Sequence, residues 1–318
     1  MARKPRIHYP GAVYHVILRG NGGQEVFFSK ADRARFYLLL REGVEKFGHR
    51  IHAFCLMSNH VHLAIQVGEI PLSRIMQNVA FRYTGYLNRR KERTGHVFQG
   101  RYKALLIDAD SYLLELVRYI HCNPVRAGLA AMPGQYPWSS HRAYLGLEAV
   151  PWLTTDWVLS RFAGTEQEAR ALYAKFVQAG ISEEHRVEFH RGTYEGRILG
   201  DDTFSEQSLT RAAERFQRRP GAGQIVTAVC AEYGIGPETI AEPGKSQPAA
   251  SARAVAAYLV REAEHLTLTE LRGLVGRDIT ALSRAAERLR VRVKLDSGLA
   301  RKVASVRRRL EQMSECPA

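Results

Sequence analysis

The run 51–67 contains two histidines separated by one apolar residue, His60-Val61-His62. Apolar residues dominate both sides of the short Met57-Ser58-Asn59 connection, a pattern typical of two strands joined in a hairpin. Side chains alternate between the faces of a strand, so His60 and His62 share one face while Val61 points to the core. Two imidazoles on a rigid strand supply two ligands of a metal site. The alternative is a half-buried strand whose polar face merely carries histidines.

Composition excludes several other classes of protein. The 318 residues are enough for two domains, and 45% hydrophobic residues exclude a largely disordered chain. No apolar run reaches the length of a membrane span, and residues 1–5 lack the core of a signal peptide, so no membrane partner is expected. Four widely separated cysteines without a CxxC pair argue for a reducing cytoplasm and against zinc–thiolate sites: Cys55, Cys122, Cys230 and Cys316.

Positive charge is unevenly distributed along the chain, whose formal net charge is +14. Residues 1–150 carry 21 Lys/Arg against 10 Asp/Glu, and residues 205–318 carry 19 against 13. The segment 151–204 between them carries 6 against 9. Two basic blocks favour two separate contacts with nucleic acid, although charge alone does not separate DNA from RNA. The alternative is a set of solvated charged faces.

Strand-like and helical periodicities alternate over the first 130 residues. We expect strands at 12–18, 51–56, 60–67 and 101–107. Helices are expected after the capping box Ser29-x-x-Asp32, from Pro71, and over 111–122 with Asp110 as its cap. The order β-α-β-β-α-β-α predicts an α+β fold, a ferredoxin-like antiparallel sheet with helices on one face.

The expected helix 111–122 presents a tyrosine beside its apolar stripe. Tyr119 lies on an adjacent stripe with Tyr112, Glu115 and Asn123. A phenolate can attack phosphorus, so Tyr119 is a candidate nucleophile, and the alternative is a packed tyrosine with a hydrogen-bonded hydroxyl. Asn123, one turn further, could lend its amide oxygen to the metal, although Pro124 biases it away from helical geometry.

Four segments together resemble the HUH-type single-tyrosine transposases, and more narrowly the REP-associated tyrosine transposases of bacterial chromosomes. They are GAVYHVILRGN (11–21), LMSNHVHLAI (56–65), GHVFQGRYKA (95–104) and YIHCNPVRAGL (119–129), and the resemblance covers roughly residues 8–145. It implies that His60 and His62 bind a divalent metal, that Tyr119 is the nucleophile, and that Asn123 completes the metal shell.

The resemblance also implies a substrate and a reaction. The loop containing Arg19 and Asn21 and the basic segment containing Arg101 and Lys103 would guide single-stranded, hairpin-forming DNA. Two imidazoles and a side-chain oxygen suit Mg²⁺ or Mn²⁺, which would polarise the phosphate while tyrosine attacks in line. A 5′-phosphotyrosine keeps the phosphodiester energy, so a second 3′-hydroxyl can rejoin the strands without ATP. We therefore expect a DNA-cleaving and strand-joining enzyme.

Two other functions stay open at this point. One is a catalytically silent, domesticated transposase that binds repeats as a DNA-binding regulator. The other is a rolling-circle replication nuclease, since such enzymes often use paired tyrosines on one helix, and Tyr112 and Tyr119 are seven residues apart on a shared stripe.

A second resemblance lies between residues 205 and 295. The runs IVTAVCAEYGIGPETI (225–240) and SARAVAAYLVREAEHLTLTELRGLVGRDITALSRA (251–285) are similar to the DNA-binding domain of the replication initiator DnaA. Thr267-x-x-Glu270 predicts one capped helix, Gly276-Arg277 a turn, and Asp278 the start of a second helix carrying Thr280 and Arg284. This is a helix-turn-helix whose second helix would enter a major groove. The alternative is an αα-hairpin within a helical bundle.

The second resemblance departs from the initiators at the start of that helix. Ile279-Thr280-Ala281 stands where the initiators carry His-Thr-Thr, and the two apolar side chains cannot make the same hydrogen bonds to base edges. Duplex binding is therefore expected without the target sequence of the initiators.

These patterns divide the chain into four expected segments. They are the transposase-like domain 1–145, a connector with short helices 146–204, the helix-turn-helix domain 205–295 and a basic C-terminal helix 296–318. The expected partners are single-stranded and hairpin DNA, with duplex DNA bound by the C-terminal module. We expect a cytoplasmic, nucleoid-associated protein and leave the choice between monomer and homodimer open.

Overall fold

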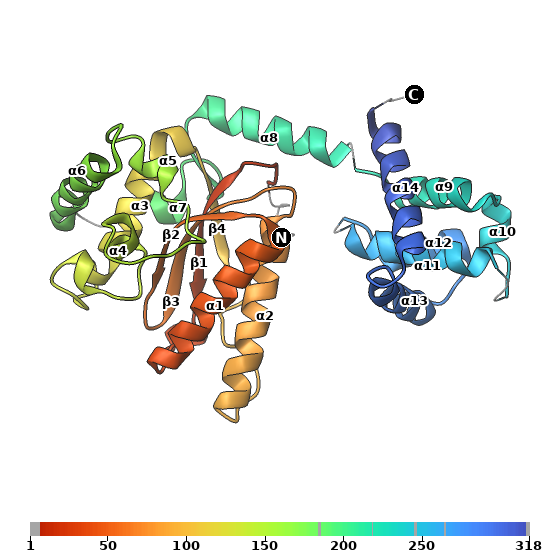
Figure 1. Cartoon of the computed structure of the whole chain (residues 1–318), viewed down its shortest axis with the longest axis horizontal. Coiled ribbons are helices and arrows are strands. Elements are labelled where there is room, and N and C mark those ends of the chain that lie inside the picture. Colours follow the sequence, from red (N-terminus) through yellow and green to blue (C-terminus); the bar gives the residue numbers. More distant parts are fainter. Residues whose placement is uncertain (1–6, 184–185, 218, 245–246, 264, 316–318) are drawn as a thin grey trace. The chain divides into compact units, whose positions relative to one another are not determined.

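The chain forms two compact units, residues 1–213 and 214–318, in a computed structural model (Figure 1). The structure describes residues 7–183, 186–217, 219–244, 247–263 and 265–315. Residues 1–5 and Cys316, which entered the expectations on targeting and cysteine usage, lie outside the described residues. Within the described part of the chain, no helix has the length and apolar character needed to cross a membrane. The two units meet inside α8 (Asp202–Gln217). This single division does not test the segment boundaries expected at 145, 204 and 295, which stay predictions.

A five-stranded sheet organises the first unit, in the order β2-β3-β1-β4-β5. Its strands are β1 (Val13–Arg19), β2 (Arg50–Leu56), β3 (His60–Gln66), β4 (Lys103–Ile107) and β5 (Ile198–Leu199). The first four pair antiparallel, whereas β5 pairs with β4 in parallel. The predicted element order and ferredoxin-like fold are confirmed for the first four strands. The two-residue β5 was not predicted, because so short a strand has no periodicity of its own.

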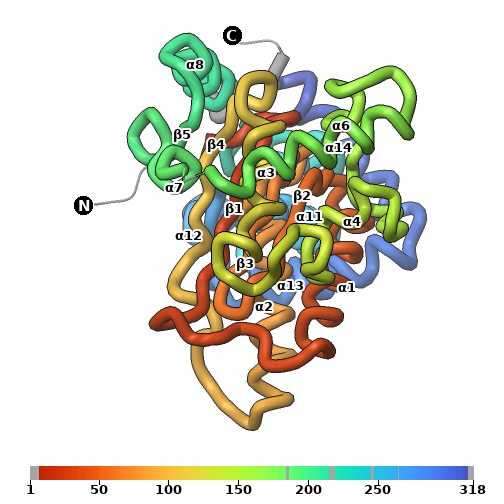
Figure 2. Tube along the Cα trace, turned by 90° about the vertical axis from the view of Figure 1, so that its left-hand side faces the viewer, coloured from red at the N-terminus to blue at the C-terminus, as the bar shows by residue number. Residues whose placement is uncertain are grey.

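Helices cover both faces of the sheet. α1 (Lys30–Phe47) and α2 (Leu72–Arg90) pack on the face that carries Val16 and Leu63, while α3 (Ala109–Arg126) packs on the opposite face. Figure 2 looks onto this second face, with α3 nearer the viewer than the strands. The expectation of helices on one face is therefore wrong for α3. Both faces need cover because alternate strand residues such as Val13 and Ala64 are also apolar.

Local capping signals set where the first helices begin. Ser29 Oγ accepts from the Asp32 backbone N–H and caps α1, as predicted. The expectation for α3 is wrong in detail, since Asp108 rather than Asp110 stands at its N-cap. Its C-terminal end also differs, because Pro124 lies inside the helix and Asn123 keeps helical geometry. Pro124 is itself buried, so packing outweighs its local preference.

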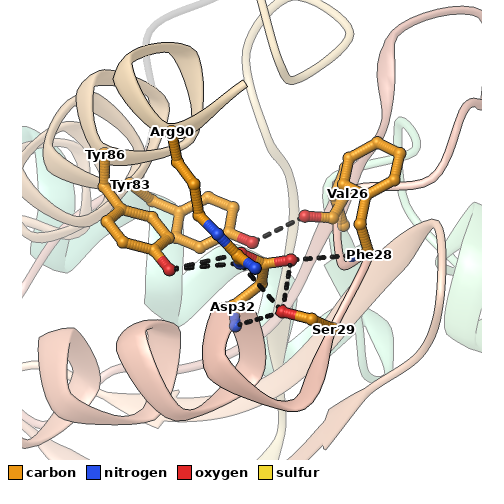
Figure 3. A network of polar contacts seen from close by, with 7 residues as sticks. All are labelled: Val26, Phe28, Ser29, Asp32, Tyr83, Tyr86 and Arg90. Carbon is orange, nitrogen blue, oxygen red and sulfur yellow. Dashed lines mark hydrogen bonds and ion pairs between the residues drawn. The ribbon is translucent and has the colours of Figure 1, made fainter. Parts of the chain in front are cut away.

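A buried carboxylate joins α1 to α2 (Figure 3). The Asp32 side chain accepts from the Phe28 backbone N–H at 2.9 Å and from Ser29 Oγ at 3.0 Å. Tyr86 and Arg90 of α2 contact its other oxygen. Burial raises the pKa of Asp32, but the hydrogen bonds from Ser29, Phe28 and Arg90 outweigh it and hold this pKa below its usual value. The network fixes the end of α2 from which the basic segment 91–103 departs.

The segment after α3 packs back onto that helix. It forms three helices of one turn, α4 (His141–Tyr144), α5 (Asp156–Leu159) and α7 (Glu188–Arg191), and the longer α6 (Glu166–Ala179). Their fully buried aromatic side chains, Tyr144, Tyr173 and Phe189, complete the core on the α3 face. The expected connector is therefore part of the first unit's core, and α7 lies against the candidate site.

The second unit is wholly helical in its described residues. Its elements are α9 (Ala222–Tyr233), α10 (Pro237–Ala241), α11 (Ala249–Glu262), α12 (Leu268–Val275), α13 (Ile279–Arg292) and α14 (Ser297–Glu315). Thr267 and Glu270 form the predicted capping box of α12, and Asp278 caps α13 through Thr280 N and Ala281 N. Gly276 turns the chain with a φ of +60°, which favours glycine. The helix-turn-helix prediction is confirmed.

Candidate active site

The paired histidines lie on the face of β3 that α3 covers. Their ring centroids are 4.8 Å apart, and Val61 points into the opposite core, as predicted. His62 is 2% exposed, whereas His60, at the end of the strand, is half-buried. One imidazole is therefore enclosed by the protein and the other reaches toward solvent.

A third histidine sets the protonation of His62. Burial lowers the pKa of His15 to about 3 and the pKa of His62 well below its usual value, so both rings are neutral at pH 7. The Phe189 carbonyl can only accept, so His15 Nδ1 donates to it at 2.9 Å and His15 Nε2 must accept. The donor to that nitrogen is His62 Nδ1, 2.9 Å away. His62 therefore keeps a lone pair on Nε2, the nitrogen that a metal needs.

His60 is also a neutral imidazole with its proton on Nδ1, but its hydrogen-bond partner is Asn59. Asn59 Nδ2 donates to the Gly23 carbonyl at 3.1 Å, which turns Asn59 Oδ1 toward His60 Nδ1 at 2.7 Å. Burial lowers the pKa of His60 to about 4, and the nearby charge of Arg19 adds to this. His60 thus donates from Nδ1 and keeps its Nε2 lone pair. Two neutral imidazoles with free Nε2 lone pairs fit a divalent metal ion.

Tyr119 of α3 lies beside His62. Their ring centroids are 5.9 Å apart, and Tyr119 Oη is 2.6 Å from Nε2 of His190. Tyr119 is only 3% exposed, and burial raises its pKa. The guanidinium of Arg126, whose Cζ is 4.4 Å from the ring centroid, opposes that rise, whereas Glu188 adds to it. The hydrogen bond of the hydroxyl fits a packed tyrosine, and the histidines and the cation around it also fit a nucleophile.

Asn123 lies one turn beyond Tyr119. Its Nδ2 donates to the Tyr119 carbonyl at 3.0 Å, and the structure gives no contact between Asn123 and His60 or His62 among the residues that it describes. No cluster of three or more His, Cys, Asp or Glu residues able to hold a metal occurs in the described part of the chain. A metal on the two histidines would therefore need oxygen ligands from an amide, water or phosphate. The role of Asn123 stays a prediction.

Two of the predicted DNA contacts lie on the histidine face. Arg19 of β1 is paired with His60 of β3, and Ile17 is paired with His62 on one side and Lys103 on the other. Residues paired across antiparallel strands share a face of the sheet. Arg19 and Lys103, both exposed, therefore place positive charge on the face that carries the two histidines.

The other two predicted contacts occupy loops at the same end of β1. Asn21 lies two residues after the end of β1, and its backbone N–H donates to the Val97 carbonyl at 3.0 Å. Gly20 and Phe98 form an isolated bridge, which holds the loop containing Arg101 near the end of β1. Asn21 and Arg101 are exposed. The structure thus brings the loops of Asn21 and Arg101 together beside the strand that carries Arg19.

Four residues near Tyr119 were not identified from the sequence. His15 interrupts an apolar strand at an alternate position, and Arg126 follows Tyr119 by seven residues on the same helix face. Both patterns can be seen in the sequence alone. No sequence pattern pointed to Phe189 and His190 as neighbours of Tyr119, because they lie about 70 residues from it in a segment without a motif.

The predicted contacts of the second unit differ in their surroundings. Thr280 and Arg284 are exposed on α13, the second helix of the helix-turn-helix. Arg277 instead donates to the backbone carbonyls of Glu242 and Gly244, each at 2.8 Å, and holds the loop after α10. Thr280 and Arg284 are therefore accessible to a DNA partner, whereas the Arg277 side chain also stabilises the loop after α10.

Comparison with known proteins agrees with this two-part organisation. Residues 9–123 match the family model of IS200-like transposases, and residues 222–289 match that of the bacterial DnaA helix-turn-helix. The chain therefore contains one segment similar to IS200-like transposases and a second segment similar to the DnaA helix-turn-helix. A solved structure of a REP-associated tyrosine transposase bound to a REP hairpin is also similar, at 16% identity and a TM-score of 0.40. The match covers 48% of this chain and 92% of that chain.

The comparison with curated proteins gave no match. The first family match includes His60, His62, Tyr119 and Asn123 but ends before Arg126 and His190. The family match therefore says nothing about the two latter residues, whose positions come from the structure alone.

Proposed function

We propose that the chain is a metal-dependent single-stranded DNA transesterase that cleaves and rejoins hairpin-forming DNA through a 5′-phosphotyrosine at Tyr119. The observation that carries this proposal is the position of Tyr119, whose ring lies 5.9 Å from that of His62 although the two come from different elements. A nucleophile and two metal-ligating groups meet there beside exposed Arg19 and Lys103. Such a combination suits attack on a phosphate held by positive charge.

Each residue has a defined part in the proposed reaction. His60 and His62 would hold Mg²⁺ or Mn²⁺ through Nε2, with Asn123 as a third ligand. When bound, the ion would polarise the scissile phosphate and stabilise its developing charge. Tyr119 Oη attacks phosphorus in line, the bond from phosphorus to the 3′ oxygen breaks, and a 3′-hydroxyl leaves. Arg126, over the ring, stabilises the negative charge of the phenolate while it attacks.

The adduct between protein and DNA tests this function directly. Wild-type protein with Mn²⁺ and a labelled single strand containing a hairpin should give a covalent adduct that survives denaturing electrophoresis. A fully paired duplex of the same sequence, without any hairpin, should give little adduct, because exposed basic loops track an unpaired backbone. Equal adduct from the duplex would contradict the proposed preference for single strands.

A second candidate function follows from the enclosure of Tyr119. With 3% of its surface exposed under α7, Tyr119 suits a catalytically silent protein that binds hairpin repeats as a regulator. Tight hairpin binding without adduct at any Mg²⁺ or Mn²⁺ concentration would favour this function. Adduct formation would exclude it.

We also propose that the second unit binds duplex DNA through α13, which would keep the protein with the nucleoid. Removing residues 218–318 retains α8, whose Phe204 and Leu209 pack on the first unit's core. The truncated protein should cleave short substrates normally but bind duplex-flanked hairpins more weakly. Counterion release makes each lost phosphate contact lower the log–log salt dependence by about 0.9. Binding titrations across salt concentrations measure this, and identical slopes and affinities would mean that the second unit does not bind DNA.

A further inference from the structure

We propose that His190 is the general base that takes the proton of Tyr119, an inference that rests on the proposed role of Tyr119 as nucleophile. His190 Nε2 is 2.6 Å from Tyr119 Oη, within the distance needed for direct proton transfer. The residue comes from α7, outside the range 9–123 that matches the transposase family. His190 touches the attacking atom, so its role would be catalytic.

A base is needed because the resting tyrosine is protonated. Burial raises the pKa of Tyr119 above its ordinary value of 10, so the phenol keeps its proton at neutral pH. The neighbouring guanidinium of Arg126 has no acceptor and cannot remove that proton. Both ring nitrogens of His15 are hydrogen-bonded, to the Phe189 carbonyl and to His62, and the remaining lone pair of His62, on Nε2, is the one proposed to bind the metal. His190 presents a ring nitrogen to the hydroxyl, and an imidazole is suited to proton transfer near pH 7.

The structure holds His190 in place through the residues around it. Phe189 is fully buried, and its ring centroid lies 5.0 Å from that of Tyr119. Arg186, just before α7, forms ion pairs of 2.6 Å with Glu115 of α3 and with Glu188 of α7. Apolar packing and ion pairs therefore fix α7 on α3 next to Tyr119. This support keeps His190 Nε2 within hydrogen-bond distance of Tyr119 Oη, as proton transfer requires.

The proposed step balances without a further reactant. The O–H bond of Tyr119 breaks, its proton moves to His190 Nε2, and Oη forms a bond to phosphorus. The bond from phosphorus to the 3′ oxygen breaks, and that oxygen takes a proton from solvent. In strand joining, an incoming 3′-hydroxyl loses its proton to solvent and attacks phosphorus, while Tyr119 Oη leaves and recovers its proton from His190.

Two substitutions of His190 in the full-length protein separate proton transfer from packing. His190→Gln keeps a hydrogen-bond acceptor near Tyr119 but cannot take a proton at neutral pH. It should slow adduct formation at saturating hairpin DNA by about 100-fold, the usual contribution of a general base, without changing hairpin affinity. His190→Ala leaves room for free imidazole, which should restore the rate with increasing concentration. The same imidazole should not restore His190→Gln, whose side chain fills the space.

Val187→Ala is the matched control, because Val187 precedes α7 directly and is 48% exposed. It should form adduct at the wild-type rate. A wild-type rate for His190→Gln, or a His190→Ala variant that imidazole cannot restore, would overturn the general-base role while leaving the transesterase in place. A wild-type protein that forms no adduct would overturn both proposals.

Discussion

Tyr119→Phe is expected to abolish the covalent adduct and to reduce DNA cleavage by about 10⁴-fold or more, the scale seen when a nucleophile is removed. Phenylalanine keeps the ring that packs on Phe189 and under Arg126, but it lacks the oxygen that attacks phosphorus. The loss of the hydrogen bond to His190 should change the free energy of unfolding by only about 1 kcal/mol. Hairpin DNA labelled at its 3′ end provides the measurement, because a 5′-phosphotyrosine links that fragment to the protein.

Tyr112→Phe is the control on the same helix. Tyr112 is half-buried on α3, seven residues before Tyr119, and the structure gives it no contact with the histidines among the described residues. Wild-type cleavage and joining by this variant agree with a single nucleophile. Normal cleavage with loss of joining would instead indicate a second nucleophile, as in a rolling-circle nuclease.

His60→Ala and His62→Ala are both expected to abolish cleavage, but with different effects on the fold. Loss of a ligating imidazole should weaken Mn²⁺ binding by more than the roughly 10–100-fold that removal of an outer hydrogen-bond partner causes. His60 is half-buried at a strand end, so its removal should leave the free energy of unfolding nearly unchanged. His62 is enclosed and donates to His15, so its removal should cost about 1–3 kcal/mol. Spectroscopic Mn²⁺ titration and thermal unfolding measure the two effects separately.

His52→Ala is the matched control for the histidine variants. His52 is buried on β2, where its Nε2 lies 3.2 Å from Gln66 Oε1 and its ring contacts Trp157. We expect this variant to lose stability yet to bind Mn²⁺ with wild-type affinity. Normal cleavage by His60→Ala in the presence of a chelator would rule out the metal site.

Local sequence patterns were sufficient to predict most helices and strands and the faces on which His60, His62 and Tyr119 lie. The alternation of a strand placed His60 and His62 on one face, and helical periodicity placed Tyr119 beside an apolar stripe. Capping residues such as Ser29 and Thr267 marked where helices begin, because a side-chain oxygen there accepts a backbone N–H a few residues away. These interactions all act between residues that are close in the sequence, so the sequence alone is enough to predict them.

Other features depend on contacts between distant parts of the chain. The bond from His15 to His62 spans 47 residues, that from Tyr119 to His190 spans 71, and that from His15 to the Phe189 carbonyl spans 174. Packing on the sheet also kept Pro124 inside α3 and placed that helix on the face opposite α1 and α2. No periodicity or spacing encodes such pairings, because they follow from how apolar faces close on one another. The neutral state of His15 and His62 and the contact of Tyr119 with His190 therefore depend on packing between distant segments, which only the tertiary structure provides.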